Sequence, residues 1–394
     1  MSATLRFAWK HFRHYRKRSL LLVLSMVLVF LLPVAVKLVV DDFATAMAAR
    51  AKETPLVVGA TGSRYDLVLS SLYFRGRVPE PLSMSDVEDV MTSGMADPIP
   101  LHLGHTAKGA PIVGTTHDYY GFRGLSFSDG GAPVFLGEAV LGAELSERFG
   151  LGVGDTLLSD QGSVFELSLT YPLQMRIVGV LEPQGSPDDT AVFCDVRTSW
   201  ILDGLGHGHV DARDEEADRL SAEGADEVVL SPATFQYNAI DETNLESFHL
   251  HGDPTELPVS SILIDAHDQR GATILGGRYQ AAAATQMLAP SEVVDELLAF
   301  VFRLRRFFNV NALFVAAAMA LLFGLVFLLS LRLRAAEFDT LHRLGFSRGT
   351  VVKLVCAEWV LVLTLGIALV ALFGFGLSGL LELYGDRILF GGTS

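Results

Sequence analysis

Charge and cysteine are both scarce in this sequence, and each scarcity excludes a class of protein. Only 19% of the 394 residues are charged while 50% are hydrophobic, a balance too apolar for an ordinary soluble protein. The two cysteines, Cys194 and Cys356, fall in an acidic block and in an apolar run respectively. We therefore expect no disulfide within the chain, and a domain with a large enough core needs none.

Motifs for catalysis and for nucleotide binding are missing as well. No glycine directly precedes a lysine, which excludes a GxxxxGK[ST] phosphate-binding loop, and the sequence contains neither HExxH nor CxxC. We therefore expect no catalytic residue and no cofactor in this chain. An enzyme acting outside the membrane is the least favoured of the functions considered.

Three long runs lack charge almost completely. Residues 20–40 and 354–377 carry one charge each, and residues 312–331 carry none. Each run reaches the roughly 20 residues needed to cross a bilayer core of about 30 Å. The sequence therefore predicts a membrane protein with three helical spans, at residues 20–40, 307–331 and 351–378.

The N-terminal region has alternative interpretations. Basic residues precede the first run and residues 46–48 resemble a cleavage site, as in a secretory signal peptide. The apolar part of a signal peptide is about 7–15 residues long, whereas this run has 21, which favours a retained anchor. Within residues 1–19, Leu5, Trp9 and Phe12 share a face among basic residues, which predicts a cytoplasmic amphipathic helix on the inner leaflet. An ordinary basic flank is the alternative.

The charges divide sharply along the chain. Residues 1–40 carry seven basic and no acidic residues, whereas residues 41–302 carry 14 basic and 40 acidic ones. Because positive flanks stay in the cytoplasm, the N-terminus and residues 332–350 are expected inside. The block at residues 41–306 and a tail at residues 379–394 are then outside, in the periplasm. Three basic residues at the outer end of the second span conflict with this topology unless they reach outer head groups: Arg303, Arg305 and Arg306.

The periodicity of the acidic block changes repeatedly between strand and helix, which predicts an α+β domain. Residues 65–73, 174–181 and 259–265 read as strands. Residues 138–149 read as a short helix, followed by a turn into a strand at residues 152–157. We expect two lobes. The membrane-proximal lobe takes residues 41–110 and 228–302, and the distal lobe takes residues 111–227.

A long helix is expected to link the acidic block to the second span. It begins at Pro290 with Ser291 as N-cap, and no breaker interrupts its apolar pattern up to residue 331. Such a helix would be about 60 Å long, twice the bilayer core, and would transmit motion across the membrane. A break at Asn309 or Asn311 is the alternative.

Histidines in a polar, acidic insert at residues 204–226 raise the question of a metal site. His207, His209 and Asp211 offer imidazole and carboxylate ligands for a divalent transition metal. A second group of the same kind follows at His249, His251 and Asp253. Neither fits a closed structural zinc site, and the favoured interpretation is a solvated acidic loop that contains histidines.

The predicted spans contain one charged candidate and two sets of small residues. Glu358 lies about one turn inside the third span, where a carboxylate is a functional candidate by default. The alternative is that it reaches head-group water or pairs with a basic residue of the preceding segment. Small residues recur every four positions, a spacing that lets helices approach closely. They are Ala316, Ala320 and Gly324 in the second span, and Gly374 and Ser378 in the third.

The segment between the second and third spans, RLRAAEFDTLHRLGFSRGTVVK at residues 332–353, resembles the coupling region of FtsX/MacB-type ABC transporter permeases. Two outer segments, LGAELSERFGLGVGDTL and RIVGVLEP, resemble the MacB-like periplasmic core domain. The order of basic N-terminus, first span, outer domain and further spans also resembles that of the family. The family has four spans, whereas three are visible in this sequence.

The resemblance implies a permease in the bacterial inner membrane that couples ATP hydrolysis by a separate ABC ATPase to motion of its periplasmic domain, for export or extraction of an envelope substrate. ATP and Mg²⁺ would belong to that partner. The resemblance also implies a homodimer or a second permease, membrane lipid, a periplasmic adaptor or substrate-binding protein, and no nucleic acid. The alternative is a membrane-anchored periplasmic sensor of a ligand or a metal, which the short cytoplasmic segments disfavour.

Within the coupling segment, the residues from Arg334 to Arg343 suit one short helix that Gly345 is placed to end. Leu341 and Leu344 share a face with Glu337, and two exposed leucines on a charged helix predict a groove in the ATPase that covers them. Contact with the inner leaflet or the neighbouring spans is the alternative. The coupling residues are Arg334, Glu337, Leu341, Arg343, Leu344, Gly345 and Arg348.

Overall fold

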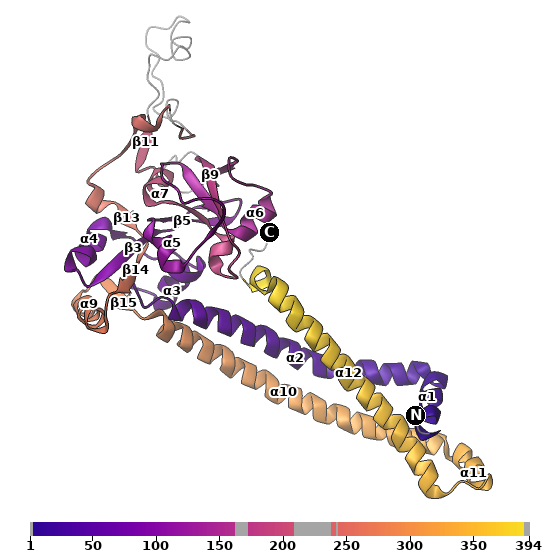
Figure 1. Cartoon of the computed structure of the whole chain (residues 1–394). Coiled ribbons are helices and arrows are strands. Elements are labelled where there is room, and N and C mark those ends of the chain that lie inside the picture. The colour runs from indigo at the N-terminus through magenta and orange to yellow at the C-terminus, as the bar shows by residue number, and fades with distance from the viewer. Residues whose placement is uncertain (1–2, 162–171, 209–237, 242, 390–394) are drawn as a thin grey trace, which may run out of the picture. The chain divides into compact units, whose positions relative to one another are not determined.

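The computed structural model describes residues 3–161, 172–208, 238–241 and 243–389 (Figure 1). The chain divides into two compact units, and each is described by itself. The helical unit comprises Met1–Thr45 and Leu297–Gly385, and the sheet unit comprises Ala46–Glu296 and Asp386–Ser394.

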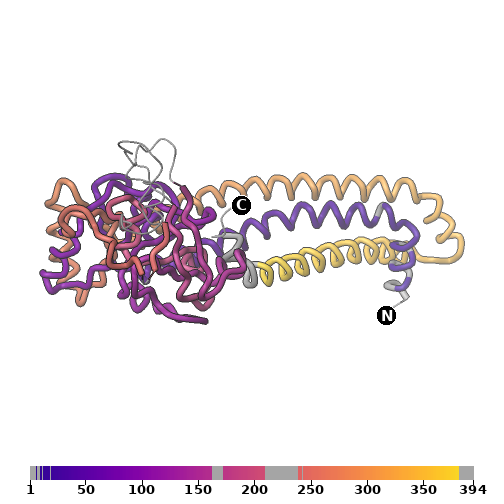
Figure 2. The backbone as a smooth tube through the Cα atoms, turned by 90° about the horizontal axis from the view of Figure 1, so that it is seen from above, coloured from indigo at the N-terminus to yellow at the C-terminus, as the bar shows by residue number. Residues whose placement is uncertain are grey.

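Long helices dominate the helical unit. Its helices are α1 (Ala3–His14), α2 (Arg16–Lys52), α10 (Pro290–Leu333), α11 (Ala335–Arg343) and α12 (Arg348–Leu389), of which α2, α10 and α12 extend beyond the unit. Among the described residues, three helical segments are long and apolar enough to cross a membrane: Ser19–Lys52, Pro290–Leu333 and Arg348–Leu380. These three run side by side in both backbone views (Figures 1 and 2). The prediction of three apolar spans is confirmed.

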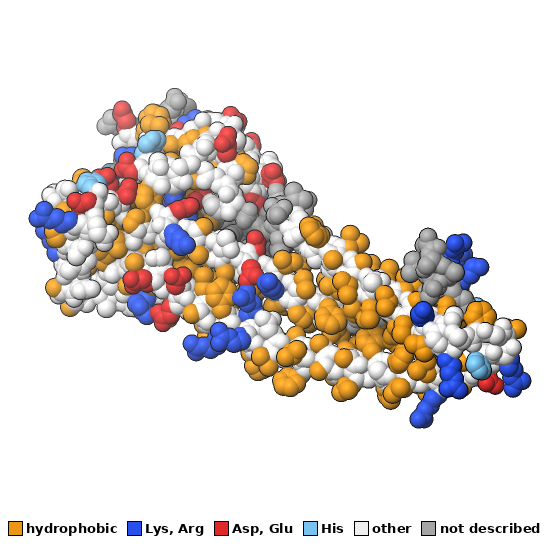
Figure 3. Space-filling model, turned by 60° about the horizontal axis from the view of Figure 1, so that its bottom comes forward, with side chains coloured by type: hydrophobic (Ala, Val, Ile, Leu, Met, Phe, Trp, Pro, Cys, Tyr) orange, Lys and Arg blue, Asp and Glu red, His pale blue; other side chains and the backbone are white. Residues whose placement is uncertain are grey.

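Helix α12 contacts both of the other long helices. Val362 packs against Val27 of α2, and Trp359 lies edge-on to Phe327 of α10 with the ring centroids 5.2 Å apart. Elsewhere hydrophobic side chains face outward along the long helices (Figure 3), and Phe375, for example, is 82% exposed. An exposed apolar surface of this extent marks contact with lipid.

The long helices are continuous where the sequence left alternatives. Helix α10 passes through Asn309 and Asn311 without a break, as expected for a single helix. Helix α2 contains Pro33 in its interior, which membrane helices tolerate. Helix α12 continues to Leu389, beyond the predicted end of the third span, because no proline interrupts the sequence there. The location of residues 379–394 outside the membrane stays a prediction.

One mixed sheet of eleven strands organises the described part of the sheet unit, in the order β15-β1-β14-β3-β5-β10-β7-β9-β6, with β4 on β5 and β8 on β9. The pairs β5–β10 and β7–β9 are parallel, and the other pairs are antiparallel. Two small two-stranded sheets, β11–β12 and β2–β13, complete it. The strands are β1 (Leu56–Ala60), β2 (Leu82–Ser83), β3 (Ala96–His102), β4 (Thr106–Ala107), β5 (Ala110–Thr115), β6 (Phe127–Gly130), β7 (Glu138–Leu141), β8 (Thr156–Leu158), β9 (Gln174–Leu181), β10 (Val192–Asp195), β11 (Gly206–Gly208), β12 (Phe248–Leu250), β13 (Pro258–Val259), β14 (Ser261–Ala266) and β15 (Thr285–Leu288).

Two hydrophobic cores serve the two halves of this sheet. One includes Val58 and Ile262 from paired strands with Leu275 of a covering helix, and the other includes Leu141 and Ile177. Strands from the beginning and the end of the unit meet in the first half, because β1 lies between β14 and β15. Which half lies nearer the membrane stays a prediction. The helices of the unit are α3 (Arg64–Tyr73), α4 (Met84–Ser93), α5 (Asp118–Arg123), α6 (Ala143–Phe149), α7 (Val196–Leu202) and α9 (Gln269–Ala281).

Two segments of the sheet unit differ from their predictions. Residues 65–73, predicted as a strand, lie in helix α3, because Ser63 caps it through the Asp66 N–H and its buried side chains follow helical spacing. Residues 138–149, predicted as one helix, are strand β7, a turn and then α6. The turn falls at Gly142, where an added Cβ would lie 2.3 Å from the carbonyl oxygen of Asp188. The strands predicted at residues 174–181 and 259–265 are confirmed by β9 and β14.

Candidate coupling site

A glycine turn ends the short helix α11. Gly345 has a φ of +93°, in the left-handed region that glycine adopts without strain. Its N–H donates to the carbonyl of His342 at 3.0 Å, and the N–H of Phe346 donates to the carbonyl of Leu341 at 3.1 Å. This pair of bonds is the Schellman motif. The expected helix and its glycine stop are therefore both present.

Arg334 holds α11 against its neighbours within the helical unit. Its Nη1 donates to Glu358 Oε2 at 2.9 Å, and its Nε donates to Glu337 Oε2 at 3.0 Å. The guanidinium also lies 5.1 Å from the ring centroid of Phe338, and the hydroxyl of Tyr15 donates to Glu337 Oε1 at 3.3 Å. Arg334 and Glu358 have side chains only 11% and 9% exposed. The carboxylate inside the third span is thus paired with a basic residue of the coupling segment.

Four exposed residues form what we call the coupling surface: Arg343, Leu344, Phe346 and Arg348. Leu344 is 71% exposed and Phe346 is 43% exposed, whereas Leu341 is half-buried. Basic side chains gather at the end of the helical unit that carries α1 and α11 (Figure 3). An apolar pair within a basic rim is a surface that a partner can cover.

Sequence reasoning misplaced one residue of this region and missed two others. Glu337 was expected beside the leucines on the partner-facing side, but its carboxylate turns back to Arg334 and Tyr15. Phe346 was missed, although an apolar residue directly after a glycine C-cap is a known signal of the Schellman motif. Tyr15 could not be found from sequence, because it lies 322 positions from Glu337.

The two sets of small residues line apolar grooves of the helical unit. Ala316, Ala320 and Gly324 border a groove of about 530 Å³ together with Trp359. Gly374 and Ser378 border a second groove, of about 630 Å³. A Cβ added to Gly324 would have no neighbour within 4 Å, so this set leaves open space. The close approach of α2 and α12 instead occurs at Gly366, where an added Cβ would lie 2.5 Å from the sulfur of Met26.

The structure also reduces the conflict of charge at the outer end of the second span. Arg305 of α10 forms an ion pair with Asp41 of α2, and its guanidinium lies 4.9 Å from the ring centroid of Phe302. A charge paired with an acid of the adjacent helix costs less to hold near the membrane than an unpaired one. One of the three arginines therefore has a partner within the helical unit.

In the sheet unit, a buried ion pair fixes the last turns of α2. Arg50 donates from Nη1 and Nη2 to the two carboxylate oxygens of Asp188, at 2.6 and 2.8 Å. Its Nε donates to the carbonyl of Leu72 at 3.2 Å, and the Tyr119 hydroxyl donates to Asp188 at 2.6 Å. Burial alone would raise the pKa of Asp188, but the charge and hydrogen bonds of Arg50 lower it below the usual value. The cluster therefore stays ionised while buried.

A second ionic group of the sheet unit joins two histidines to one aspartate. Asp203, which follows α7, contacts His102 Nε2 and His105 Nε2 at 2.6 Å each. Burial would raise the pKa of Asp203, but the hydrogen bonds from the two histidines lower it well below its usual range. The side chains of Asp203 and His105 are 27% and 21% exposed.

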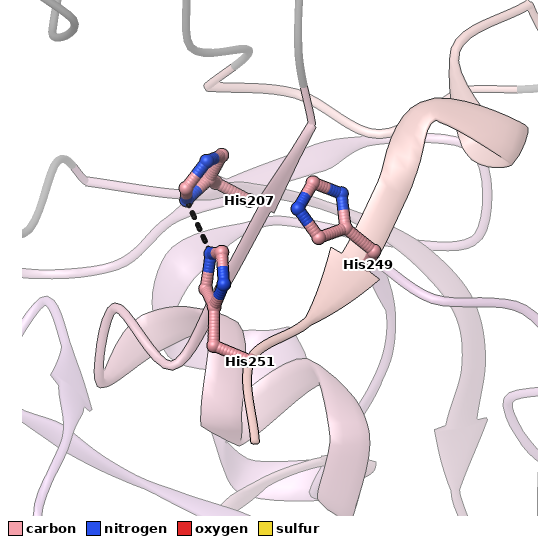
Figure 4. A group of neighbouring side chains, drawn as sticks. All are labelled: His207, His249 and His251. Atoms are coloured by element: carbon pink, nitrogen blue, oxygen red, sulfur yellow. Dashed lines mark hydrogen bonds between the residues drawn. The ribbon is translucent and has the colours of Figure 1, made fainter.

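The predicted metal ligands are only partly described. His209 and Asp211 lie outside the described residues. His207 lies in β11 and is brought beside His249 and His251 of the second predicted group (Figure 4). The two predicted histidine groups are separate in the sequence, and the pairing of β11 with β12 brings them together.

Comparison with known families identifies the chain. The model of the MacB-like periplasmic core domain matches residues 19–236, more than half of the chain. The model of the FtsX-like permease C-terminal region matches residues 309–393. The chain belongs to the FtsX/MacB-type permeases. In this permease, α11 and the coupling surface fall within the FtsX-like region.

Two solved structures are similar to part of this chain. The periplasmic region of MacB from Actinobacillus actinomycetemcomitans has 9% sequence identity and a TM-score of 0.36, covering 62% of this chain and 94% of that one. The extracellular domain of the noncanonic ABC-type transporter YknZ from Gram-positive bacteria has 9% identity and a TM-score of 0.31, covering 59% and 98%. No curated protein sequence matches this chain.

Membership of the family assigns the chain its general role. It is a multi-pass membrane protein with a periplasmic or extracellular domain, and it is a non-catalytic subunit of an ABC transporter. The family implies an ABC ATPase as its partner.

Proposed function

We propose that this permease converts ATP-driven closure of a separate ATPase into motion of its sheet unit, for export or extraction of an envelope substrate in the bacterial inner membrane. ATP and Mg²⁺ are bound by the ATPase. The observation that carries the proposal is the coupling surface, where Leu344 and Phe346 stand exposed beside two arginines.

Contacts of Arg334 connect the helix that precedes the coupling surface to the long helices, so that a displacement of this surface reaches them. Arg334 joins the beginning of α11 to Glu358 of α12 and to Glu337, which in turn accepts from Tyr15. Because the Arg334–Glu358 pair is almost fully buried, α11 cannot tilt without disturbing α12. Force on Leu344 and Phe346 is therefore passed on to the helical unit.

Two of the long helices also have an end built into the sheet unit. Helix α2 contributes Arg50 to the buried cluster with Asp188, and α10 contributes Val293 and Val294 to the buried interior. Each of these helices is unbroken from its end in the sheet unit to its end near the coupling segment. A continuous helix transmits an axial displacement because its backbone hydrogen bonds resist stretching.

The proposal is tested by Leu344→Asp plus Phe346→Asp in the full-length permease. Burying each apolar side chain in a partner contributes roughly 1.5–3 kcal/mol, and each 1.4 kcal/mol is about tenfold in affinity. We therefore expect at least a tenfold loss of the ATPase that co-purifies with the permease. Leu341 is left unchanged because it is half-buried, and replacing it would disturb the helical unit itself.

Met91→Asp is the matched control, since Met91 is 61% exposed on α4 of the sheet unit. It should retain the ATPase, and both variants should reach the membrane at the wild-type level. Undiminished ATPase binding and ATP turnover in the double variant would overturn the proposed role of the coupling surface.

We also propose that the permease pairs with a second copy of itself or with another permease, and that it contacts a periplasmic adaptor. Light scattering of the purified permease tests the first of these.

A further inference from the structure

Three histidines meet on the small sheet β11–β12, in a part of the molecule that the coupling proposal does not use. One ring nitrogen from each of His207, His249 and His251 lies within 4.8 Å of those of the other two. The ring centroids are 4.7 to 5.3 Å apart. Figure 4 shows the three rings converging from the two strands. His207 is half-buried and the other two are exposed, so an ion in solution can reach them.

The backbone builds this cluster by strand pairing. His207 lies directly opposite His249 in the antiparallel ladder, and His251 follows His249 by two positions, just after β12 ends at Leu250. Gly206 and Gly208 flank His207, and a Cβ at either would lie within 2.8 Å of Leu250 or Phe248. The Gly-His-Gly sequence therefore lets β11 approach β12 closely enough to bring the rings together.

One pair of ring nitrogens already has the spacing that a tetrahedral ion requires. His207 Nδ1 and His251 Nε2 are 3.2 Å apart. Two imidazole nitrogens bound to one zinc ion at 2.0–2.1 Å in a tetrahedron are about 3.3 Å apart. An ion bound by both nitrogens would lie to one side of the line that joins them and would replace the proton of their hydrogen bond.

His249 is oriented to supply the third ligand. Its Nδ1 lies 3.3 Å from the carbonyl oxygen of Ser247, a residue of its own chain segment. A ligating histidine commonly donates its other ring N–H to a backbone carbonyl, which fixes the ring and the tautomer. In the tautomer that carries its proton on Nδ1, Nε2 of His249 has the lone pair that would bind a metal.

We propose that His207, His249 and His251 form a binding site for one zinc ion on the sheet unit. Among the described residues the site has three imidazoles and neither thiolate nor carboxylate, a set that selects a borderline ion such as Zn²⁺ over Mg²⁺ or Ca²⁺, which require oxygen ligands. These three ligands would leave the fourth tetrahedral position to water or to another ligand. Zinc at this site joins β11 to β12 and so clamps together two chain segments that lie about forty residues apart in sequence.

The test is zinc binding by the full-length permease, purified in detergent without a polyhistidine tag and stripped with a chelator. Isothermal titration with ZnCl₂ should give one tight site per chain, with a dissociation constant of a micromolar or less. MgCl₂ at the same concentration should give no heat from this site. His207→Ala and His249→Ala should each weaken zinc binding at least tenfold, because each removes one of three ligands.

The matched control is His267→Ala, which removes an exposed histidine of the sheet unit that is paired with Asp97 instead. This variant should bind zinc as the wild type does. A His102→Ala plus His105→Ala variant tests whether the other histidine group binds the ion. Either of two results would overturn the assignment. One is that the His207→Ala plus His249→Ala variant keeps the tight site. The other is that only the His102→Ala plus His105→Ala variant loses it. Thermal unfolding without zinc shows whether each variant is folded.

Discussion

The two arginine–carboxylate pairs that hold the long helices differ in how far they are removed from water. Arg50 and Asp188 in the sheet unit have side chains 6% and 1% exposed, and the carboxylate accepts from both guanidinium nitrogens and from Tyr119. Arg334 and Glu358 in the helical unit are 11% and 9% exposed, and Arg334 shares its guanidinium with the half-exposed Glu337. Asp188 and Tyr119, the side-chain partners of Arg50, are buried, whereas Arg334 has one half-exposed partner, Glu337.

This difference decides which of the contacts can be broken at little cost in free energy. A fully buried and fully bonded pair has no alternative arrangement of similar energy, because any movement leaves a charge buried without a partner. The contact of Arg334 with the half-exposed Glu337 contributes only about 0–1 kcal/mol, whereas breaking its pair with the buried Glu358 would leave a buried charge without that partner. Both buried pairs therefore fix the helices that they join, and only the Arg334–Glu337 contact can be broken at little cost.

The largest effect on stability is expected at the Arg50–Asp188 pair. Arg50→Ala leaves Asp188 buried without its partner, which costs about 3–5 kcal/mol of folding free energy. The thermal unfolding of the full chain, followed by circular dichroism, should shift to much lower temperature. Arg197→Ala is the control, since Arg197 pairs with Asp195 while half exposed, and its removal should cost less than about 1 kcal/mol. Equal shifts in the two variants would remove the distinction between buried and open pairs.

A smaller effect is expected at Asp203, whose side chain is 27% exposed and is therefore less buried than either pair. Its pKa is lowered in the folded protein, so the stability that it contributes is complete above its unfolded pKa of about 4. That stability is lost as the pH falls from there toward the lower folded pKa. Asp203→Asn should cost about 1.5–3 kcal/mol at neutral pH and should unfold less steeply on acidification than the wild type. Parallel acid-unfolding curves for the two proteins would show that Asp203 carries no such linkage.

Local features of the fold could be predicted from the sequence because they depend on neighbouring residues. The three spans follow from runs of apolar residues, and the end of α11 follows from Gly345. The strand at residues 65–73 was wrong because a run of nine residues with mixed polarity fits either periodicity, and the Ser63 cap decided for a helix.

The contacts that define the sites could not be predicted, because they join residues far apart in sequence. Arg50 lies 138 positions from Asp188, and His207 lies 44 positions from His251. Pairing of β11 with β12 merged two histidine groups that the sequence could only list separately. Pairing of Glu358 with a basic residue of the coupling segment was one of the open alternatives, and the fold shows that this residue is Arg334.

The central claim is that Arg334 and Glu358 transmit the motion of the ATPase, and ATP turnover of the assembled transporter tests it most directly. Arg334→Gln and Glu358→Gln should each retain the ATPase, because the coupling surface is intact, but should lower permease-dependent ATP turnover about fivefold or more. The reversed pair, Arg334→Glu with Glu358→Arg, should recover part of the loss. Wild-type turnover in both single variants would contradict the account.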